Sequence, residues 1–177
     1  MILEVVPLGT DVVDAALERE LVALVARALP HAHLNGRWYW DSRPDVVVVA
    51  REGASVIGFR MILWRDVVVG ARSCSIVGTG VAVDPDWQRQ GIATALTHKL
   101  LELATGRDAI VVFLGTDEAR PLLDRFGFQL LGVPVSSKNE AGAVVVEEAP
   151  CLVKELKPGF TDGVEAAGSL FLGRGTW

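Results

Sequence analysis

Apolar and polar positions along the first half of the chain form blocks that predict strands and one long helix. Residues Ile2 to Leu8 are apolar and β-branched, which is typical of a strand. From Val12 to Leu29 the apolar residues recur at helical spacing, with Thr10 or Asp11 as the cap and Pro30 as the end. Further strands are predicted over Asp45–Ala50, over Val56–Trp64 with an extension at Val67–Val69, and over Ser73–Val83.

The second half repeats this alternation of helices and strands. A helix is predicted from Gly91 to about Thr105, because Ile92, Leu96 and Leu100 recur at helical spacing. The later predicted elements are a strand over Ala109–Leu114, a helix over Asp117–Phe126 capped by Thr116, and strands over Gln129–Val135, Val144–Val146 and Cys151–Leu156. Ser136–Gly142 is expected to form a polar turn, and Pro158–Trp177 an irregular, Gly-rich tail.

The connections between these elements favour an α/β chain with a mixed sheet. A helix joins the strand Ser73–Val83 to the strand Ala109–Leu114, so these two strands are expected to pair in parallel. No repeat, low-complexity tract or linker divides the sequence. We therefore expect one domain over residues 1–177, with an irregular tail from about residue 158.

Composition and charge narrow the class of function. The 177 residues are 50% hydrophobic and carry a formal net charge of −5, with a pI of about 5.2. This acidic balance disfavours a nucleic-acid partner, and no apolar run reaches the ~20 residues that span a bilayer. The N-terminus lacks the basic lead of a signal peptide, and Cys74 and Cys151 both lie in apolar stretches, so we expect free thiols and a cytoplasmic location.

The stretch from Val81 to Leu96 carries the clearest chemical signal. A strand ends near Val83, Pro85 interrupts it, and a polar loop leads to Gly91, where the helix begins. A helix start leaves backbone N–H groups free and carries the positive end of the helix dipole. Such a corner suits a phosphate or a pyrophosphate.

The order β-α-β-β-β-α-β-α-β-β and two motifs resemble the GCN5-related N-acetyltransferases over nearly the whole chain. The run Gln88-Arg89-Gln90-Gly91-Ile92-Ala93 is similar to the pyrophosphate loop of that family, and Ala119–Phe128 is similar to its later stretch ending in Gly-Phe. The resemblance implies the GNAT fold, an α/β (α+β) architecture whose mixed sheet of about seven strands splays at the central strand and is flanked by three to four helices. It also implies acetyl-CoA as the acyl donor.

The same resemblance assigns the donor-binding residues. The loop amides, with the hydroxyl of Thr94, would hold the pyrophosphate, and the edge of the central strand would hold the pantetheine arm. The amide of Val83 would donate to the thioester carbonyl and stabilise the oxyanion. Thr116 would lie near the cofactor. The implied donor-binding residues are Val81, Ala82, Val83, Gln88, Arg89, Gln90, Gly91, Ile92, Ala93, Thr94 and Thr116.

Two positions depart from the family pattern. Leu123 stands where many members have a tyrosine that protonates the leaving thiolate, and Thr79 stands where the aminoglycoside subgroup has a glutamate base. Asp84 follows the central strand and is the candidate replacement, the alternative being a solvated turn carboxylate. Proton transfer is therefore expected to rely on Thr79, Asp84 or the acceptor amine itself, with positioning supplying much of the rate.

The acceptor side is marked by aromatic and acidic residues. Residues 38–41 form an aromatic loop that suits a sugar or a cationic amine, although aromatics pinning the loop to the core would give the same pattern. The two histidines His31 and His33 are too few for a catalytic zinc site, so no metal is expected. The candidate substrate-binding residues are Trp38, Tyr39, Trp40, Asp41, Glu147 and the terminal Trp177.

The sequence therefore predicts an acetyl-CoA-dependent N-acetyltransferase acting on a small, cationic or amino-sugar amine in a ternary complex. In style it is nearest to aminoglycoside 2′-N-acetyltransferases and nodulation-factor N-acyltransferases. The alternatives are a non-catalytic acyl-CoA-binding module and an N-acyltransferase with a longer acyl donor. The expected partner is the amine acceptor, with neither nucleic acid nor membrane and with a homodimer left open.

Overall fold

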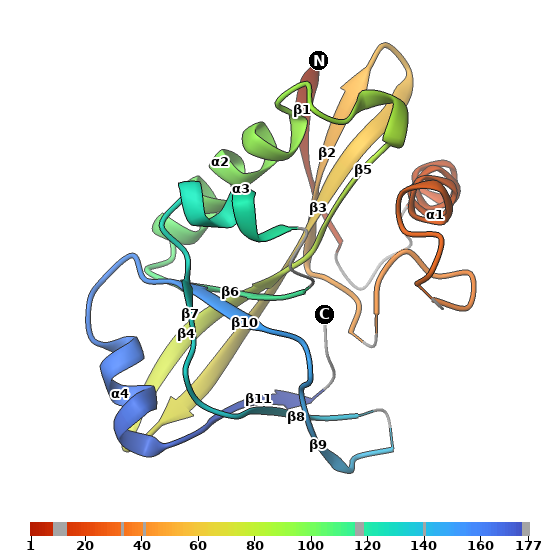
Figure 1. Cartoon of the computed structure of the whole chain (residues 1–177). Coiled ribbons are helices and arrows are strands. Elements are labelled where there is room, and N and C mark those ends of the chain that lie inside the picture. The colour runs from red at the N-terminus through yellow and green to blue at the C-terminus, as the bar shows by residue number, and fades with distance from the viewer. Residues whose placement is uncertain (9–13, 33, 41, 116–118, 140, 175–177) are drawn as a thin grey trace.

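The computed structural model describes the backbone of residues 1–8, 14–32, 34–40, 42–115, 119–139 and 141–174 (Figure 1). Within these ranges helices and strands alternate along the chain as the sequence predicts. In chain order the elements are β1 (Ile2–Pro7), α1 (Ala15–Ala28), β2 (Val46–Glu52), β3 (Ser55–Val69), β4 (Arg72–Thr79), β5 (Val81–Val83), η1 (Pro85–Trp87), α2 (Ile92–Thr105), β6 (Ile110–Leu114), α3 (Arg120–Arg125), β7 (Gln129–Leu130), β8 (Val135–Lys138), β9 (Val144–Val146), β10 (Cys151–Lys154), α4 (Phe160–Ala167) and β11 (Leu170–Arg174).

The large sheet is mixed. Its strands follow the order β1-β2-β3-β4-β6-β10-β7, and β5 pairs with β3 outside this path. The β4–β6 pair is parallel, because α2 returns the chain to the same edge of the sheet, and this confirms the prediction for these strands. The remaining pairs of this sheet are antiparallel. The predicted fold class, with a mixed sheet and flanking helices, is confirmed.

The central strand is split at Gly80, and this split opens the sheet. The prediction of one strand over Ser73–Val83 was wrong, since β4 pairs with β3 from Leu63 onward while β5 pairs with residues 58–60 of β3. β3 is correspondingly one continuous strand, Ser55–Val69, rather than a strand with a separate extension. Since β6 pairs with β4 and not with β5, the two neighbours of β3 diverge after Gly80.

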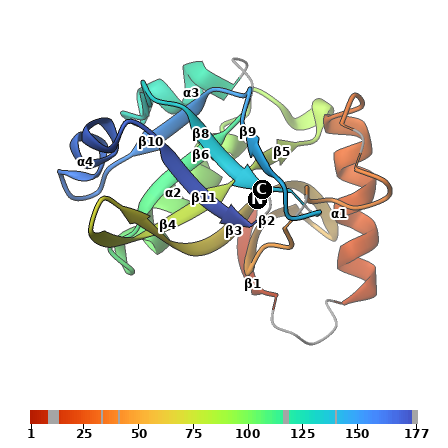
Figure 2. The same cartoon turned by 90° about the horizontal axis from the view of Figure 1, so that it is seen from below.

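Helices α2 and α3 cover one face of the large sheet, and α1 covers part of the other (Figures 1 and 2). The apolar stripe of α2 supplies Ile92, Leu96 and Leu100, which pack on Val77 and Val111 of the sheet. On the opposite face Leu17, Leu21 and Leu24 of α1 pack against β2, β3 and β5. Helix α1 begins after Asp14, whose carboxylate accepts a hydrogen bond from the amide of Ala16 at 3.0 Å; the proposed caps Thr10 and Asp11 lie outside the described residues.

A second sheet of strands β11-β8-β9 lies beside α4 and differs from the sequence-based expectation. The polar turn expected over Ser136–Gly142 contains most of β8, and the tail expected to be irregular forms α4 and β11. In α4, Phe160 and Val164 are buried, and the carboxylate of Glu155 accepts hydrogen bonds from the first amides of the helix. Of the predicted strand Gln129–Val135, only β7 at Gln129–Leu130 joins the large sheet.

No helix in the described part of the chain is both long enough and apolar enough to cross a bilayer.

Candidate functional site

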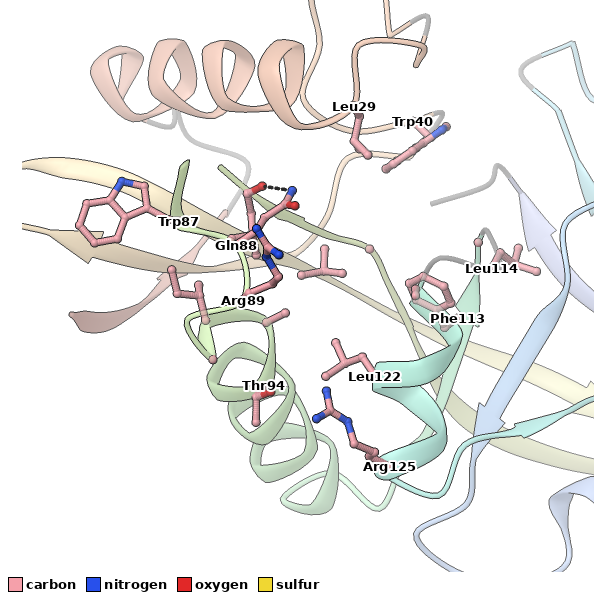
Figure 3. Close-up of a pocket in the computed structure, with 18 residues that line it drawn as sticks. Leu29, Trp40, Trp87, Gln88, Arg89, Thr94, Phe113, Leu114, Leu122 and Arg125 are labelled. Carbon is pink, nitrogen blue, oxygen red and sulfur yellow. Dashed lines mark hydrogen bonds between the residues drawn. The ribbon is translucent and has the colours of Figure 1, made fainter. Parts of the chain in front are cut away.

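A cavity of about 770 Å³ occupies the split in the sheet (Figure 3). It lies between β5 and the end of β6, with the first turn of α2 and helix α3 along one side and the chain after α1 on the other. The lining residues are Leu29, Trp40, Gly80, Val81, Val83, Trp87, Gln88, Arg89, Gly91, Ile92, Ala93, Thr94, Phe113, Leu114, Gly115, Ala119, Leu122 and Arg125.

One end of the cavity is built to hold an anion. Gly91 caps α2 with a φ of 82°, a left-handed conformation that glycine adopts without strain. The first α-helical bond runs from the amide of Ala95 to the carbonyl of Gly91 at 2.9 Å, so the three preceding amides of α2, at residues 92–94, have no helical acceptor. The helix dipole adds partial positive charge at this point, and Arg89 stands in the loop before it.

Arg125 adds a second cation to this end, and the sequence analysis did not select it. Its side chain extends from the last turn of α3 toward the first turns of α2 (Figure 3). No ion pair of Arg125 with another described residue is found, whereas Arg120 on the same helix lies 3.8 Å from Asp124. Helical spacing carried the signal, since Arg125 lies three residues after Leu122, which also lines the cavity.

The outer edge of β5 forms the second wall. Asp84 donates its amide to the carbonyl of Ile57, and Met61 donates its amide to the carbonyl of Gly80. In this antiparallel register Ala82 is the residue of β5 that bonds to β3, opposite Phe59. The amides and carbonyls of Val81 and Val83 therefore point away from β3, toward the cavity. The carbonyl of Val83 accepts a bond of 3.3 Å from the side-chain amide of Gln88 (Figure 3).

Two of the expected donor-binding residues face elsewhere. The side chain of Ala82 is buried against the α1 face of the sheet, and Gln90 donates to the carbonyl of Asp86 at 3.4 Å. Neither lines the cavity. Thr116 lies outside the described residues.

Asp84 is engaged in an ion pair. Its carboxylate accepts hydrogen bonds from the guanidinium of Arg27 and, at 3.1 Å, from the amide of Asp86, so it also caps η1. The bond from Arg27 is the main cause that holds the pKa of Asp84 below its ordinary value. A carboxylate that is buried, paired and of lowered pKa is a weak base, which disfavours the proposed proton-transfer role and replaces the alternative of a solvated turn residue.

Thr79 is fully buried beneath the cavity and does not line it. Its hydroxyl donates to the carbonyl of Met61 at 2.7 Å and accepts from the guanidinium of Arg60 at 3.2 Å. Both hydrogen-bonding functions of the hydroxyl are thus used inside the core. Leu123, at the position of the missing tyrosine, is likewise buried, and Leu122 is its neighbour that faces the cavity.

The other end of the cavity is apolar. Leu29 and Trp40 approach from the chain after α1, and Phe113 and Leu114 from the end of β6 (Figure 3). Gly80 stands between them, and a side chain there would meet the terminal methyl of Met61 at 2.6 Å. This end suits an apolar group rather than a charged one.

The residues expected to bind the acceptor separate into three groups. Trp40 lines the cavity, whereas Trp38 is fully buried and makes edge-to-face contacts with Tyr39 and Phe59, so Trp38 belongs to the core and cannot wall a pocket. The carboxylate of Glu147 accepts a bond of 2.5 Å from the hydroxyl of Ser137, and Glu147 does not line the cavity. Asp41 and Trp177 lie outside the described residues.

Within the described chain, Arg89 and Arg125 are the ionisable side chains that line the cavity; no described carboxylate, imidazole, phenol or thiol does so. The two cysteines are free, and burial raises the pKa of the Cys151 thiol to about 12. The geometry thus offers anion binding, an open strand edge and an apolar end. Among the described residues it offers no general base.

Comparisons with known proteins agree with this geometry. A family model described as the acetyltransferase (GNAT) family matches residues 14–128. No curated protein sequence matches the chain significantly.

Solved structures share the fold at low sequence identity. A GNAT family acetyltransferase from Brucella melitensis, in complex with acetyl-CoA, is 19% identical over 90% of this chain and 91% of that one, with a TM-score of 0.53. An aminoglycoside 6′-N-acetyltransferase complexed with coenzyme A is 13% identical over 90% and 99% of the two chains, with a TM-score of 0.59. Eis1 from Mycobacterium abscessus is 17% identical over 76% of this chain, which spans 32% of the Eis1 chain, with a TM-score of 0.58.

Proposed function

Because the chain belongs to the GNAT acetyltransferase family, we propose that it transfers an acetyl group from acetyl-CoA to the amine of a small molecule. The observation that carries this proposal is the meeting of two sets of free backbone amides across one cavity. The first turn of α2 and the outer edge of β5 both present them. A cofactor with a pyrophosphate at one end and an amide-bearing arm matches both sets.

The donor would lie with its pyrophosphate on the amides of Ile92, Ala93 and Thr94. Gly91 leaves this approach open, because nothing lies within 4 Å of the position that a side chain would take. Arg89 and Arg125 add charge for the phosphates. The arm would then run back along β5 as an additional strand.

This direction decides which amide meets the thioester. An arm that starts at α2 reaches the amide of Val83 first and the amide of Val81 second, nearer to Gly80 and the apolar end. We therefore move the thioester from Val83, the residue expected from the sequence, to Val81, and leave Val83 to bind the arm. The Val81 amide would stabilise the oxyanion of the tetrahedral intermediate.

The reaction is a direct attack in a ternary complex. The lone pair of the acceptor nitrogen forms the new C–N bond, and the C–S bond of the thioester breaks as the tetrahedral intermediate collapses. The proton of the amine ends on the leaving sulfur, directly or through water, since a thiol of pKa about 8.5 needs little help to leave. The acceptor would enter beside Trp40, and an amino sugar is compatible with its aromatic face.

Two other functions each have one supporting observation. The lack of a general base among the described cavity residues favours a non-catalytic acyl-CoA-binding module. The apolar end formed by Leu29, Trp40, Phe113 and Leu114 favours a longer acyl donor. A cytoplasmic location and a homodimer stay predictions.

Calorimetric titration with acetyl-CoA, followed by thiol release with a panel of amines, tests the proposal. We expect micromolar binding and release of coenzyme A in the presence of an amino-sugar or other small amine. Binding without turnover of any amine would support the module instead, and faster turnover of hexanoyl-CoA than of acetyl-CoA would support the longer donor. No binding of any acyl-CoA would refute all three functions.

A further inference from the structure

Arg60 is a fully buried cation with no acidic partner among the described residues. It lies on β3 with 0% of its surface exposed. Its guanidinium donates to the hydroxyl of Thr79 at 3.2 Å and to the hydroxyl of Thr97 at 2.8 Å, and its Nε has no acceptor among the described residues. Buried charges in proteins are normally paired, so this arrangement calls for an explanation.

The position of Arg60 relates it to the cavity. It stands directly opposite Val81 in the β3–β5 register, and residues directly opposite lie on the same face of a sheet. Its partner Thr97 lies one helical turn after Ala93, and the Thr97 hydroxyl donates to the Ala93 carbonyl at 2.7 Å. The guanidinium therefore lies under the cavity floor, on the order of 10 Å from an anion bound at the first amides of α2.

The local structure does not require this charge. The hydroxyls of Thr79 and Thr97 each donate to a backbone carbonyl and would keep those bonds without Arg60. The N-terminal half of α2 also carries the positive end of the helix dipole, which repels a cation. Burial lowers the pKa of Arg60 to about 9, so the side chain still carries its charge at neutral pH.

We propose that Arg60 is a buried counter-charge for the phosphates of the anionic acyl donor, acting through the cavity floor without touching the donor. This inference rests on the proposed function of the cavity. In the free protein the guanidinium is an uncompensated charge that destabilises the fold. The donor supplies the missing negative charge, and the low polarity of the core strengthens the attraction between the two.

Arg60→Met and Arg60→Lys test this proposal with two measurements each. For Arg60→Met we expect the melting temperature of the free protein to stay the same or rise, since an unpaired buried charge is replaced by an apolar side chain. We expect its affinity for acetyl-CoA to fall about tenfold, the coupling for unit charges ~10 Å apart at an effective dielectric of about 20. Arg60→Lys keeps the charge and should retain most of that affinity.

A ligand without phosphates provides the control. S-acetylpantetheine carries the arm and the thioester but no charge, so the Arg60→Met substitution should leave its KM within about twofold of wild type. Equal losses for both ligands would overturn the proposal, because they would indicate a distorted cavity. A lowered melting temperature with unchanged acetyl-CoA affinity would overturn it as well, because Arg60 would then be structural.

The Arg60→Lys variant keeps the test decisive if Arg60→Met fails to fold. Wild-type affinity for acetyl-CoA and a weaker dependence of that affinity on the residue's exact geometry would support the counter-charge, and a tenfold loss in a folded Arg60→Lys protein would overturn it. Failure of the proposed function is distinguishable, because the wild-type protein itself would then bind no acetyl-CoA.

Discussion

The guanidinium of Arg27 donates a hydrogen bond to the carboxylate of Asp84, and this ion pair joins the last turn of α1 to the residue that follows β5. The chain after α1 brings Leu29 and Trp40 to the apolar end of the cavity, and the chain after Asp84 leads to Gln88. The pair therefore fixes the acceptor-side wall of the cavity against the loop that leads to α2.

Asp84 should act in stability and not in proton transfer. Its pKa is lowered in the folded protein, mainly by Arg27, so its contribution is present above the unfolded pKa of about 3.9 and is lost as the pH falls through the lower folded value. We expect Asp84→Asn, which keeps the cap of η1, to lower the free energy of unfolding by about 1 kcal/mol at pH 7, and the difference from wild type to vanish below about pH 3. Chemical denaturation across this pH range measures it. An unchanged kcat completes the expectation, and a loss of 10²-fold or more would restore Asp84 as a base.

Gly91 should be the position most sensitive to negative charge. Its φ of 82° strains any L side chain, so Gly91→Gln and Gly91→Glu share a loss of stability of roughly 1–2 kcal/mol. Only Gly91→Glu also places a carboxylate at the phosphate site. We expect this variant to bind acetyl-CoA at least tenfold more weakly than Gly91→Gln in calorimetric titration, with the gap narrowing in high salt. Equal affinities of the two variants would contradict the assignment of the α2 amides to the pyrophosphate.

Proline substitutions can remove the amides of β5 one at a time. Val81→Pro and Val83→Pro each delete an amide that points away from β3, where proline is tolerated. We expect Val81→Pro to lower kcat by roughly 10²–10³-fold, as loss of an oxyanion donor does, and Val83→Pro chiefly to raise KM for acetyl-CoA. Steady-state kinetics separates the two, and the reverse pattern would return the thioester to Val83.

Ala82→Pro is the matched control for these variants. Its amide belongs to the ladder with β3, so its loss should lower the free energy of unfolding by about 1–3 kcal/mol. We expect this variant to show the largest drop in melting temperature of the three.

The fold and the donor side of the site could be predicted because their signals are local. The spacing of Ile92, Leu96 and Leu100 specifies the buried stripe of α2, and Gly91 marks the start of that helix. Both are properties of a few consecutive residues. The parallel pairing of β4 with β6 follows from the intervening helix alone.

The features that were missed depend on tertiary contacts. The split at Gly80 arises because β3 is long enough to pair with two strands, which the apolar run over Ser73–Val83 does not reveal. Helix α4 depends on Glu155, whose carboxylate accepts from the amides of Gly159 and Thr161 before the helix. The roles of Asp84 and Thr79 were set by Arg27 and Arg60, which are distant in sequence.

Trp40 and Trp38 should differ in what their loss affects. Trp38 is fully buried, so Trp38→Ala should lower the free energy of unfolding by about 3–5 kcal/mol. Trp40 lines the cavity beside Gly80, so Trp40→Ala should enlarge the apolar end and leave most of the stability in place. We expect Trp40→Ala to raise the ratio of kcat/KM for hexanoyl-CoA over acetyl-CoA by about tenfold, as assayed by thiol release. An unchanged ratio would place the acyl group away from Trp40.

Arg125 and Arg120 offer a matched pair on one helix. Arg125 lines the cavity and points toward the first turns of α2, whereas Arg120 is exposed and lies 3.8 Å from Asp124 (Figure 3). Both substitutions to glutamine remove one positive charge and keep a helix-forming side chain, so they change net charge and helix propensity equally.

We expect Arg125→Gln to weaken acetyl-CoA binding about tenfold, because a charge-assisted bond to a phosphate contributes roughly 1.5–3 kcal/mol before solvent exposure reduces it. Arg120→Gln should bind like wild type. The slope of log Kd against log salt concentration should become shallower for Arg125→Gln alone, because one cation that meets the phosphates is lost while the overall charge matches that of the control. Equal affinities and slopes for the two variants would show that α3 contributes only its apolar face, through Leu122, to the donor site.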